Sequence, residues 1–321
     1  MRTVLTERNF PASSIKFLAS ERSAGKRIDY RGKTYTVEAI RPEAFAGVQI
    51  VLSSTPSSVS KEYGPIAAKQ GAIVVDNSSA WRMDPDVPLV VPEVNADELK
   101  RIPKGIVANP NCVAIPLCVA LKPLHDIARV LRIIVSTYQS SSGKGATGLQ
   151  DFEQQLHSWV KGEPVIAKAH RAQLAGNVIT LDWTLDPNGY TEEENKVVNE
   201  TKKILGDQTI AVSPTCVRVP VKISHCESIN VEFERPISVE EAKAALAKAP
   251  GVVLMDETQG GAFPQPIHAE GKDATFVGRI RQDLGRATAL NLWVVADNLR
   301  KGAATNAVQV AEELIKRGIV K

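Results

Sequence analysis

The chain has 321 residues, 43% of them hydrophobic and 23% charged, so it is long enough for two globular domains with sizeable cores. Lys and Arg total 39 against 36 Asp and Glu and are scattered along the chain, which argues against a nucleic-acid-binding protein. The N-terminus lacks an apolar run, and no stretch reaches the roughly 18 apolar residues of a membrane span, so no signal peptide or membrane anchor is expected.

The four cysteines show neither Cys-x-x-Cys spacing nor the density of a disulfide framework. They therefore predict no metal site and fit a reducing compartment. We expect a cytoplasmic protein.

The first third of the chain alternates short apolar runs with helical or turn-rich pieces, the pattern of a parallel sheet with crossover helices. The candidate strands are 15–19, 48–53, 72–76 and 87–91. Small polar residues follow two of them, at 53–58 and 76–79. Because ligands gather at the carboxyl ends of strands in doubly wound sheets, these loops predict a dinucleotide-binding, Rossmann-like domain.

From Leu131 onward a second α/β domain with a second sheet is expected, with strands at 133–138, 217–221 and 229–233. A helix is predicted at 192–205, capped by Thr191 and with three acidic residues in its first turn. A closing helix is predicted at 299–317. The expected domains are 1–111 with 299–321 for the cofactor, and 112–298 for catalysis and dimerisation.

Cys112 is the candidate nucleophile. The preceding Asn-Pro-Asn, 109–111, predicts a tight turn, and the apolar run after Cys112 looks helical. A thiol at a helix N-terminus has a lowered pKa, although a lone cysteine is more often a buried small hydrophobe.

Two further segments give Cys112 chemical partners. In the strand-like segment 218–225, His225 could exchange a proton with the thiol and Arg218 could grip a carboxylate with two hydrogen bonds. Gln139 ends a β-prone run that enters a Ser/Gly-rich turn, where its amide could orient a tetrahedral intermediate. Considered alone, Arg218 is more often a surface charge, and the turn after Gln139 is an ordinary hairpin loop.

Together these segments resemble the aspartate-semialdehyde dehydrogenase family. The similar motifs occur in the family's order: Asp-Asn-Ser-Ser-Ala-x-Arg at 76–82, Asn-Pro-Asn-Cys at 109–112, Ser-Thr-Tyr-Gln at 136–139, Cys-Val-Arg-Val-Pro-Val at 216–221 with His-x-Glu at 225–227, and Asn-Leu-Arg-Lys-Gly-Ala-Ala at 298–304.

The resemblance implies an NADP-dependent, phosphorylating oxidoreductase that interconverts aspartate 4-semialdehyde and 4-aspartyl phosphate in lysine (diaminopimelate), methionine and threonine biosynthesis. It implies that Cys112 forms the covalent thioester, with His225 as acid/base and Gln139 orienting the intermediate. It further implies that Arg218 binds the substrate carboxylate and Glu193 the substrate amine. Phosphate would be bound by Arg82 and Lys196.

The family resemblance also implies the cofactor and the assembly. Arg22 and Ser23 follow the strand that ends at Ala19 and suit the 2′-phosphate of NADP. The other residues implied to line the cofactor are Ser53, Ser54, Pro56, Ser142, Gly143 and Asn298. A homodimer, formed through the second domain, is expected.

The chain departs from the family pattern at its start, where the first strand and the Gly-x-x-Gly-x-x-Gly turn for the pyrophosphate are missing. Either the start codon is assigned too far downstream or the chain is truncated, and the first explanation is favoured. A chain without that strand would expose sheet edges and bind NADP weakly.

Smaller departures lie near the nucleophile. The family's Cys-Ser-Thr-Ile-Gln is Cys-Val-Ala-Ile-Pro here, at 112–116, so two hydroxyls are lost. Lys144 replaces a small residue in the Gln139 loop, and Ser224 replaces the glycine that often precedes the histidine.

Three alternatives stay open on the sequence. An N-acetyl-γ-glutamyl-phosphate reductase shares the cysteine, histidine and acyl-phosphate chemistry, but Arg218 and Glu193 fit a free amino acid better. A truncated non-catalytic paralogue would keep only the dimerising domain. A hydrolase would use Cys112 and His225 with water.

Overall fold

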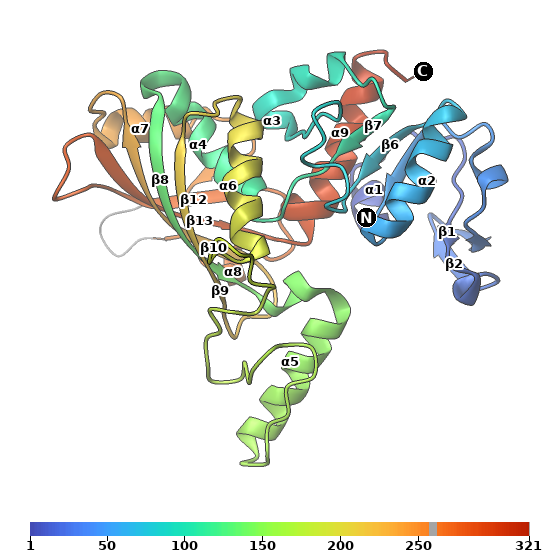
Figure 1. Cartoon of the computed structure of the whole chain (residues 1–321), viewed down its shortest axis with the longest axis horizontal. Helices are drawn as coiled ribbons and strands as arrows, with labels where there is room; N and C mark the ends of the chain where they lie inside the picture. Colours follow the sequence, from blue (N-terminus) through green and yellow to red (C-terminus); the bar gives the residue numbers. More distant parts are fainter. Residues whose placement is uncertain (257–261, 321) are drawn as a thin grey trace. The chain divides into compact units, whose positions relative to one another are not determined.

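The protein, analysed as a computed structural model, is described over residues 1–256 and 262–320 (Figure 1). The chain divides into two compact units. Unit 1 comprises Met1–Pro92, Ala96–Asn109 and Ala304–Lys321, and unit 2 comprises Glu93–Asn95 and Pro110–Ala303.

Unit 1 is built on a parallel sheet in the order β5-β6-β7, as the alternating pattern predicts. The strands are β5 (Ile50–Ser53), β6 (Ile73–Asp76) and β7 (Ile106–Ala108). Helix α2 (Ser57–Lys69) links the first two, and α9 (Thr305–Lys316) packs on the sheet. Their shared core consists of apolar side chains from strands, loops and α9: Val75, Val90, Leu99, Val107, Ala307, Val310, Leu314 and Val320.

The rest of unit 1 consists of short elements. These are α1 (Arg2–Glu7), β1 (Leu18–Ala19), β2 (Arg27–Tyr30), β3 (Lys33–Thr36), β4 (Glu38–Ala39), and 3-10 turns at Glu21–Ser23, Pro42–Phe45 and Ala96–Lys100. Of the short helix α3 (Pro92–Asn95), only Pro92 belongs to unit 1. The strand predicted at 15–19 is reduced to β1. The strand predicted at 87–91 is wrong, because only a single bridge from Leu89 to Ala108 forms. Pro88, which has no N–H to donate, interrupts the ladder there.

Unit 2 contains a six-stranded sheet in the order β11-β12-β13-β10-β8-β9. The strands are β8 (Val130–Gln139), β9 (Ala211–Arg218), β10 (His225–Phe233), β11 (Val252–Leu254), β12 (Thr275–Gln282) and β13 (Ala289–Ala296). The pairs β8/β9 and β11/β12 are parallel and the other three are antiparallel, so the predicted mixed sheet is present.

Helices cover one face of this sheet. They are α4 (Ala114–Ala128), which contacts strands β8, β10, β12 and β13, α6 (Glu192–Leu205), which contacts β9, and α7 (Val239–Leu246). A short helix, α8 (Pro266–Ala269), lies near β13. The prediction for 192–205 is confirmed to the residue. Thr191 and Glu194 form a capping box, with each side chain bonded to the other's backbone N–H.

Helix α5 (Gly145–Val160) and the segment 161–191, which has little regular structure, run side by side (Figure 1). Asp151 accepts the backbone N–H of Ala169 at 2.7 Å, and Gln155 accepts that of Leu174 at 2.6 Å. Phe152, Leu174 and Ile179 form a small core between them. The segment is therefore held in a defined course, although it forms no helix or strand of its own.

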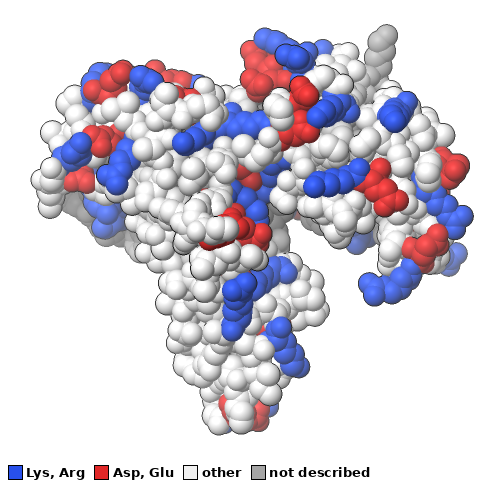
Figure 2. All heavy atoms as spheres, viewed as in Figure 1, with Lys and Arg blue, Asp and Glu red and all other residues white. Residues whose placement is uncertain are grey.

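On the face drawn in Figure 2, basic and acidic side chains are interspersed. Among the described residues, no helix combines the length and the apolar character that crossing a bilayer requires.

Candidate functional site

Three neighbouring strands of the unit 2 sheet bring Gln139, Arg218 and His225 to one edge. β8 ends at Gln139, which pairs in register with Arg218 at the end of parallel β9. β10 is antiparallel to β8 and begins at His225, next to the Cys226–Tyr138 pair. All three side chains are buried on the face that the helices cover.

The prediction of one strand from Arg218 to His225 is therefore wrong. The two residues lie on different strands, and the chain between them, 219–224, is a loop. Pro220 cannot donate to a ladder, which ends the predicted strand 217–221 at Arg218.

Ser140 holds the arginine and the histidine from its backbone. Its carbonyl accepts a hydrogen bond from Nη1 of Arg218 at 2.7 Å, and its N–H donates to Nδ1 of His225 at 3.0 Å. Gly143 lies on the same two side chains, since a Cβ there would be 2.8 Å from Nη1 of Arg218 and 3.2 Å from Nε2 of His225. Only glycine fits this close approach.

His225 is neutral at physiological pH. Burial, and then the nearby Arg218 charge, lower the pKa of His225 to about 3. Because Nδ1 accepts the Ser140 N–H, the ring proton lies on Nε2. That Nε2 is buried and has no hydrogen-bond partner among the described residues, so it can donate to a ligand.

Cys112 lies two residues before α4, and its neighbour Asn111 ties it to the sheet. The Asn111 Oδ1 accepts the N–H of Val113 at 2.8 Å, and its Nδ2 donates to Oε1 of Glu193 at 3.0 Å. Nε2 of Gln139 donates to the same oxygen at 3.0 Å. Glu193 on α6 thus links the turn that carries the thiol to the end of β8.

Cys112 is the most accessible of the four cysteines. Its side chain is partly exposed, whereas Cys118, Cys216 and Cys226 are buried. Burial raises the pKa of Cys216 well above its usual range and that of Cys226 to about 12, so these two thiols stay protonated.

Lys196 and Glu193 lie one helical turn apart, as expected. Nζ of Lys196 is 3.5 Å from Oε2 of Glu193 and 3.9 Å from Glu192. The Lys196 side chain is 27% exposed and that of Glu193 only 8%. The lysine therefore pairs along its own helix and still reaches the solvent side of the site.

A short π-helix, Arg300–Ala304, approaches the thiol from the C-terminal part of the chain. A Cβ at Gly302 would lie 3.1 Å from the Cβ of Cys112, so the Gly302 backbone touches the nucleophile turn. The neighbouring Lys301 is fully buried and pairs with Glu93 at 2.6 Å. The predicted closing helix is thus an α-helix only from Thr305, because its first turn is widened here.

The side chain of Asn298 is used to hold loops. Its Oδ1 accepts hydrogen bonds from the Ser140 and Ser142 hydroxyls, both at 3.1 Å, and from the N–H of Ser224 at 2.9 Å. It is 3% exposed. The structure therefore gives Asn298 a positioning role for the loop that the sequence alone did not reveal, and a cofactor contact by Asn298 or Ser142 stays a prediction.

Ser224, which replaces a family glycine, has a strained backbone. Its φ is +76°, and its buried hydroxyl has no partner among the described residues. We expect Ser224→Gly to raise the free energy of unfolding by about 1 kcal/mol, because lost strain and desolvation outweigh the extra entropy of the unfolded glycine. Urea denaturation measures this. Ser224→Ala, which removes only the hydroxyl, separates the two terms, and a destabilised glycine variant would contradict the assignment of strain.

The remaining predicted residues lie in unit 1. Nε of Arg82 donates to the Asn109 carbonyl at 3.0 Å and Nη2 to that of Asn77 at 2.8 Å, so the guanidinium ties two loops of the sheet's carboxyl edge. Arg22 is exposed in the 3-10 turn after β1, and Ser23 is half-buried beside it. Ser53 is the last residue of β5, and Ser54 and Pro56 lie in the loop between β5 and α2.

The two units match the two domains of the semialdehyde dehydrogenases. Residues 1–102 match the semialdehyde dehydrogenase NAD binding domain, and residues 121–301 match the semialdehyde dehydrogenase dimerisation domain. This is the class of protein that the fold and the site define.

Similar proteins narrow the class. An aspartate-semialdehyde dehydrogenase of Aquifex aeolicus is 52% identical over 99% of this chain and 94% of its own length. Aspartate semialdehyde dehydrogenase II of Vibrio cholerae, solved as a complex with ASA, has a TM-score of 0.95 at 44% identity, covering 98% of this chain and 93% of that one. The Candida albicans enzyme, solved with NADP, has a TM-score of 0.78 at 25% identity, covering 99% and 96%.

The chain belongs to the aspartate-semialdehyde dehydrogenase family. The family predicted from the sequence is confirmed, as is its class, an oxidoreductase that acts on an aldehyde. The similar proteins favour it over the N-acetyl-γ-glutamyl-phosphate reductase alternative and the non-catalytic one.

Proposed function

We propose that the protein interconverts aspartate 4-semialdehyde and 4-aspartyl phosphate through a covalent thioester on Cys112, with NADP as the redox partner. The observation that carries this proposal is the meeting of Gln139, Arg218 and His225 at one sheet edge, joined through Glu193 to the turn of Cys112. It is supported by the family and by the relative solved with ASA.

The oxidative direction begins at Cys112. Its sulfur adds to the aldehyde carbon, and the thiol proton is transferred to the carbonyl oxygen, which becomes the hydroxyl of a thiohemiacetal. Oxidation of the thiohemiacetal carbon releases a hydride, for which NADP, when bound, would supply the acceptor. The hydroxyl proton passes to solvent, and the product is the thioester. Phosphate then attacks the thioester carbon, so that the acyl phosphate forms and the Cys112 thiolate departs.

The buried polar groups suit these steps. Nε2 of His225 carries a proton and has no hydrogen-bond partner among the described residues, so it suits the role of an acid that donates to the reacting oxygen and stabilises negative charge on it. The Ser140 hydroxyl lies 3.1 Å from Nδ1 and donates to Asn298, so Nδ1 is left to accept the Ser140 N–H. Gln139 keeps its Oε1 without a partner among the described residues.

The charged groups suit the substrate's ends. Arg218 binds the α-carboxylate and Glu193 the amine, and the partly exposed Lys196 with Arg82 binds phosphate. The opposite charges of Arg218 and Glu193 match the carboxylate and the ammonium group of a free amino acid. An acylated amine carries no positive charge and would not match Glu193.

Unit 1 carries groups that fit NADP. Arg22 offers an exposed guanidinium and Ser23 a hydroxyl for a 2′-phosphate, and the loop from Ser53 to Pro56 follows the carboxyl end of a parallel strand. Gly143, Ser142 and Asn298 are proposed to contact the cofactor on the side of His225, against which Gly143 packs. We further propose that the units are the cofactor and catalytic domains, that the enzyme is a homodimer, and that it is cytoplasmic.

Phosphate dependence tests the proposal. We expect the purified protein to reduce more than one equivalent of NADP with aspartate semialdehyde only when phosphate or arsenate is present, because the thioester needs an anionic acceptor for turnover. Absorbance of NADPH measures the rate. Sustained NADPH formation without either anion would point to a non-phosphorylating dehydrogenase. Hydrolysis of 4-aspartyl phosphate to aspartate and phosphate without NADPH would point to the hydrolase.

A further inference from the structure

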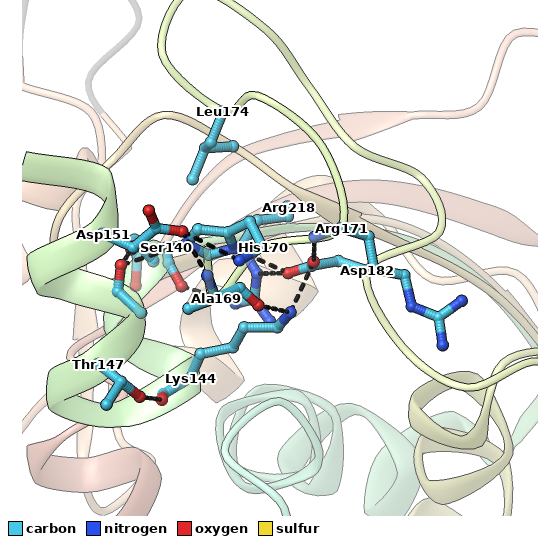
Figure 3. A network of polar contacts seen from close by, with 12 residues as sticks. Ser140, Lys144, Thr147, Asp151, Ala169, His170, Arg171, Leu174, Asp182 and Arg218 are labelled. Carbon is cyan, nitrogen blue, oxygen red and sulfur yellow. Dashed lines mark hydrogen bonds and ion pairs between the residues drawn. The ribbon is translucent and has the colours of Figure 1, made fainter. Parts of the chain in front are cut away.

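A buried carboxylate stands behind Arg218. Asp182 lies in the segment between α5 and α6, and Figure 3 shows dashed lines that join its carboxylate to neighbouring residues. Oδ2 accepts from Nε of Arg218 at 2.9 Å and lies 3.0 Å from Nδ1 of His170. Oδ1 accepts from Nζ of Lys144 at 2.7 Å and from the N–H of Arg171 at 3.1 Å.

Backbone pairing fixes the position of Asp182. Ile179, three residues earlier, forms an antiparallel bridge with Arg218, with hydrogen bonds of 2.9 and 2.8 Å between their N–H and carbonyl groups. The segment therefore adds to the outer edge of β9 next to the arginine itself. The carboxylate, with its side chain fully buried, has little freedom to move away.

The contacts of Arg218 define which part of its guanidinium remains for a ligand. Nε is bonded to Asp182 and Nη1 to the Ser140 carbonyl, while the planar group stacks over the Trp183 ring at 4.5 Å. Nη2 has no hydrogen-bond partner among the described residues. The side chain is thus held at one end and on one face, and its outer end is left for a carboxylate.

The charges in this cluster are unequal. Arg218 and Lys144 bring two cations to the single carboxylate of Asp182, and the Arg218 side chain is only 2% exposed. A buried cation needs a compensating anion, and the buried Arg218 shares Asp182 with Lys144, whose side chain is 22% exposed. An incoming substrate carboxylate would supply the second anion.

Asp182 remains ionised across the physiological range. Burial alone raises its pKa, but hydrogen bonds from His170, Lys144 and Arg218 outweigh this and hold the pKa well below its usual range. The carboxylate charge is therefore always present to orient the guanidinium.

We propose that Asp182 is the positioning residue for substrate recognition: it fixes Nε of Arg218 so that the outer guanidinium faces the α-carboxylate, and Lys144 holds its second oxygen. This inference rests on the proposed role of Arg218. It also gives a purpose to Lys144, which replaces a small residue of the family pattern and whose Nζ additionally donates to the Ala169 carbonyl at 2.9 Å.

The test compares two substrates. Aspartate semialdehyde carries the α-carboxylate, and 3-aminopropanal is the same aldehyde without it. We expect Asp182→Asn to lower kcat/KM for aspartate semialdehyde about 10- to 100-fold, mainly through KM, because an amide removes the charge and turns a donor toward the cations. The same variant should change kcat/KM for 3-aminopropanal and the KM for phosphate less than about threefold. Asp186→Asn, a charge removal in the same segment, is the matched control and should leave both substrates unaffected.

The outcomes separate the two proposals. Equal losses with both substrates would mean that Asp182 only supports the fold and would overturn the inference. If Arg218→Lys discriminates between the substrates but Asp182→Asn does not, Arg218 keeps its role and the inference fails. If Arg218→Lys itself does not discriminate, the proposed role of Arg218 fails. Should Asp182→Asn not fold, Lys144→Met carries the test, with a smaller loss confined to aspartate semialdehyde expected and equal losses overturning the inference.

Discussion

Cys112→Ala should abolish turnover, lowering kcat by roughly 10⁴-fold or more, because no other described group can form the thioester. The remaining thiols are buried, and burial raises the pKa of Cys216 and Cys226 far above the physiological range. Phosphate-dependent NADP reduction at saturating substrate measures the loss. The substitution removes one atom from a partly exposed position, so the thermal unfolding midpoint should hardly change.

Cys118→Ala is the matched control for the nucleophile. Cys118 lies six residues further along, fully buried in α4, and burial raises its pKa, so its thiol stays protonated. The control should cost about 1 kcal/mol of stability and keep its activity. Substantial turnover by Cys112→Ala, or its loss in Cys118→Ala alone, would contradict the assignment.

Arg218→Lys should lower kcat/KM for aspartate semialdehyde about 100-fold, mostly by raising KM. Lysine keeps the positive charge but cannot hold Asp182 and the Ser140 carbonyl, stack on Trp183 and present two further donors at once. Steady-state kinetics with each substrate varied in turn measure the effect. The KM for phosphate should stay near its wild-type value.

Arg235→Lys provides the control for the arginine. Arg235 is half-exposed and pairs with Glu241 at 2.7 Å, away from the β8–β9 edge, so the same exchange there should be neutral. If Arg218→Lys kept the wild-type KM for aspartate semialdehyde, the assignment of Arg218 to substrate binding would be wrong.

The sequence predicts the bounds of an element most accurately where its capping residues and its packing in the fold favour the same ends. Helix α6 begins and ends at the predicted residues because Thr191 and Glu194 form a capping box and Gly206 ends the helix in a left-handed conformation. The predictions of a strand at 87–91 and of a strand that continues past Arg218 are wrong. Pro88 and Pro220 have no backbone N–H to donate to a sheet, and a pattern of apolar residues does not reveal this loss.

The site could be predicted only in part. The nucleophile turn and the Gln139 loop are read from short local motifs, but the pairing of Gln139 with Arg218 depends on sheet register, which a sequence does not state. Asp182 lies in a segment without periodicity, so nothing in its surroundings marks it. Its role follows only from contacts made across 36 and 38 residues, with Arg218 and Lys144.

The most direct test of the account is the covalent thioester. The protein is mixed with aspartate semialdehyde and NADP without phosphate or arsenate, quenched in acid, digested and analysed by mass spectrometry. We predict an aspartyl adduct on the Cys112 peptide, formed with one equivalent of NADPH and discharged when phosphate is added before the quench. Formation of NADPH with no adduct on Cys112, or an adduct on another residue, would contradict the account.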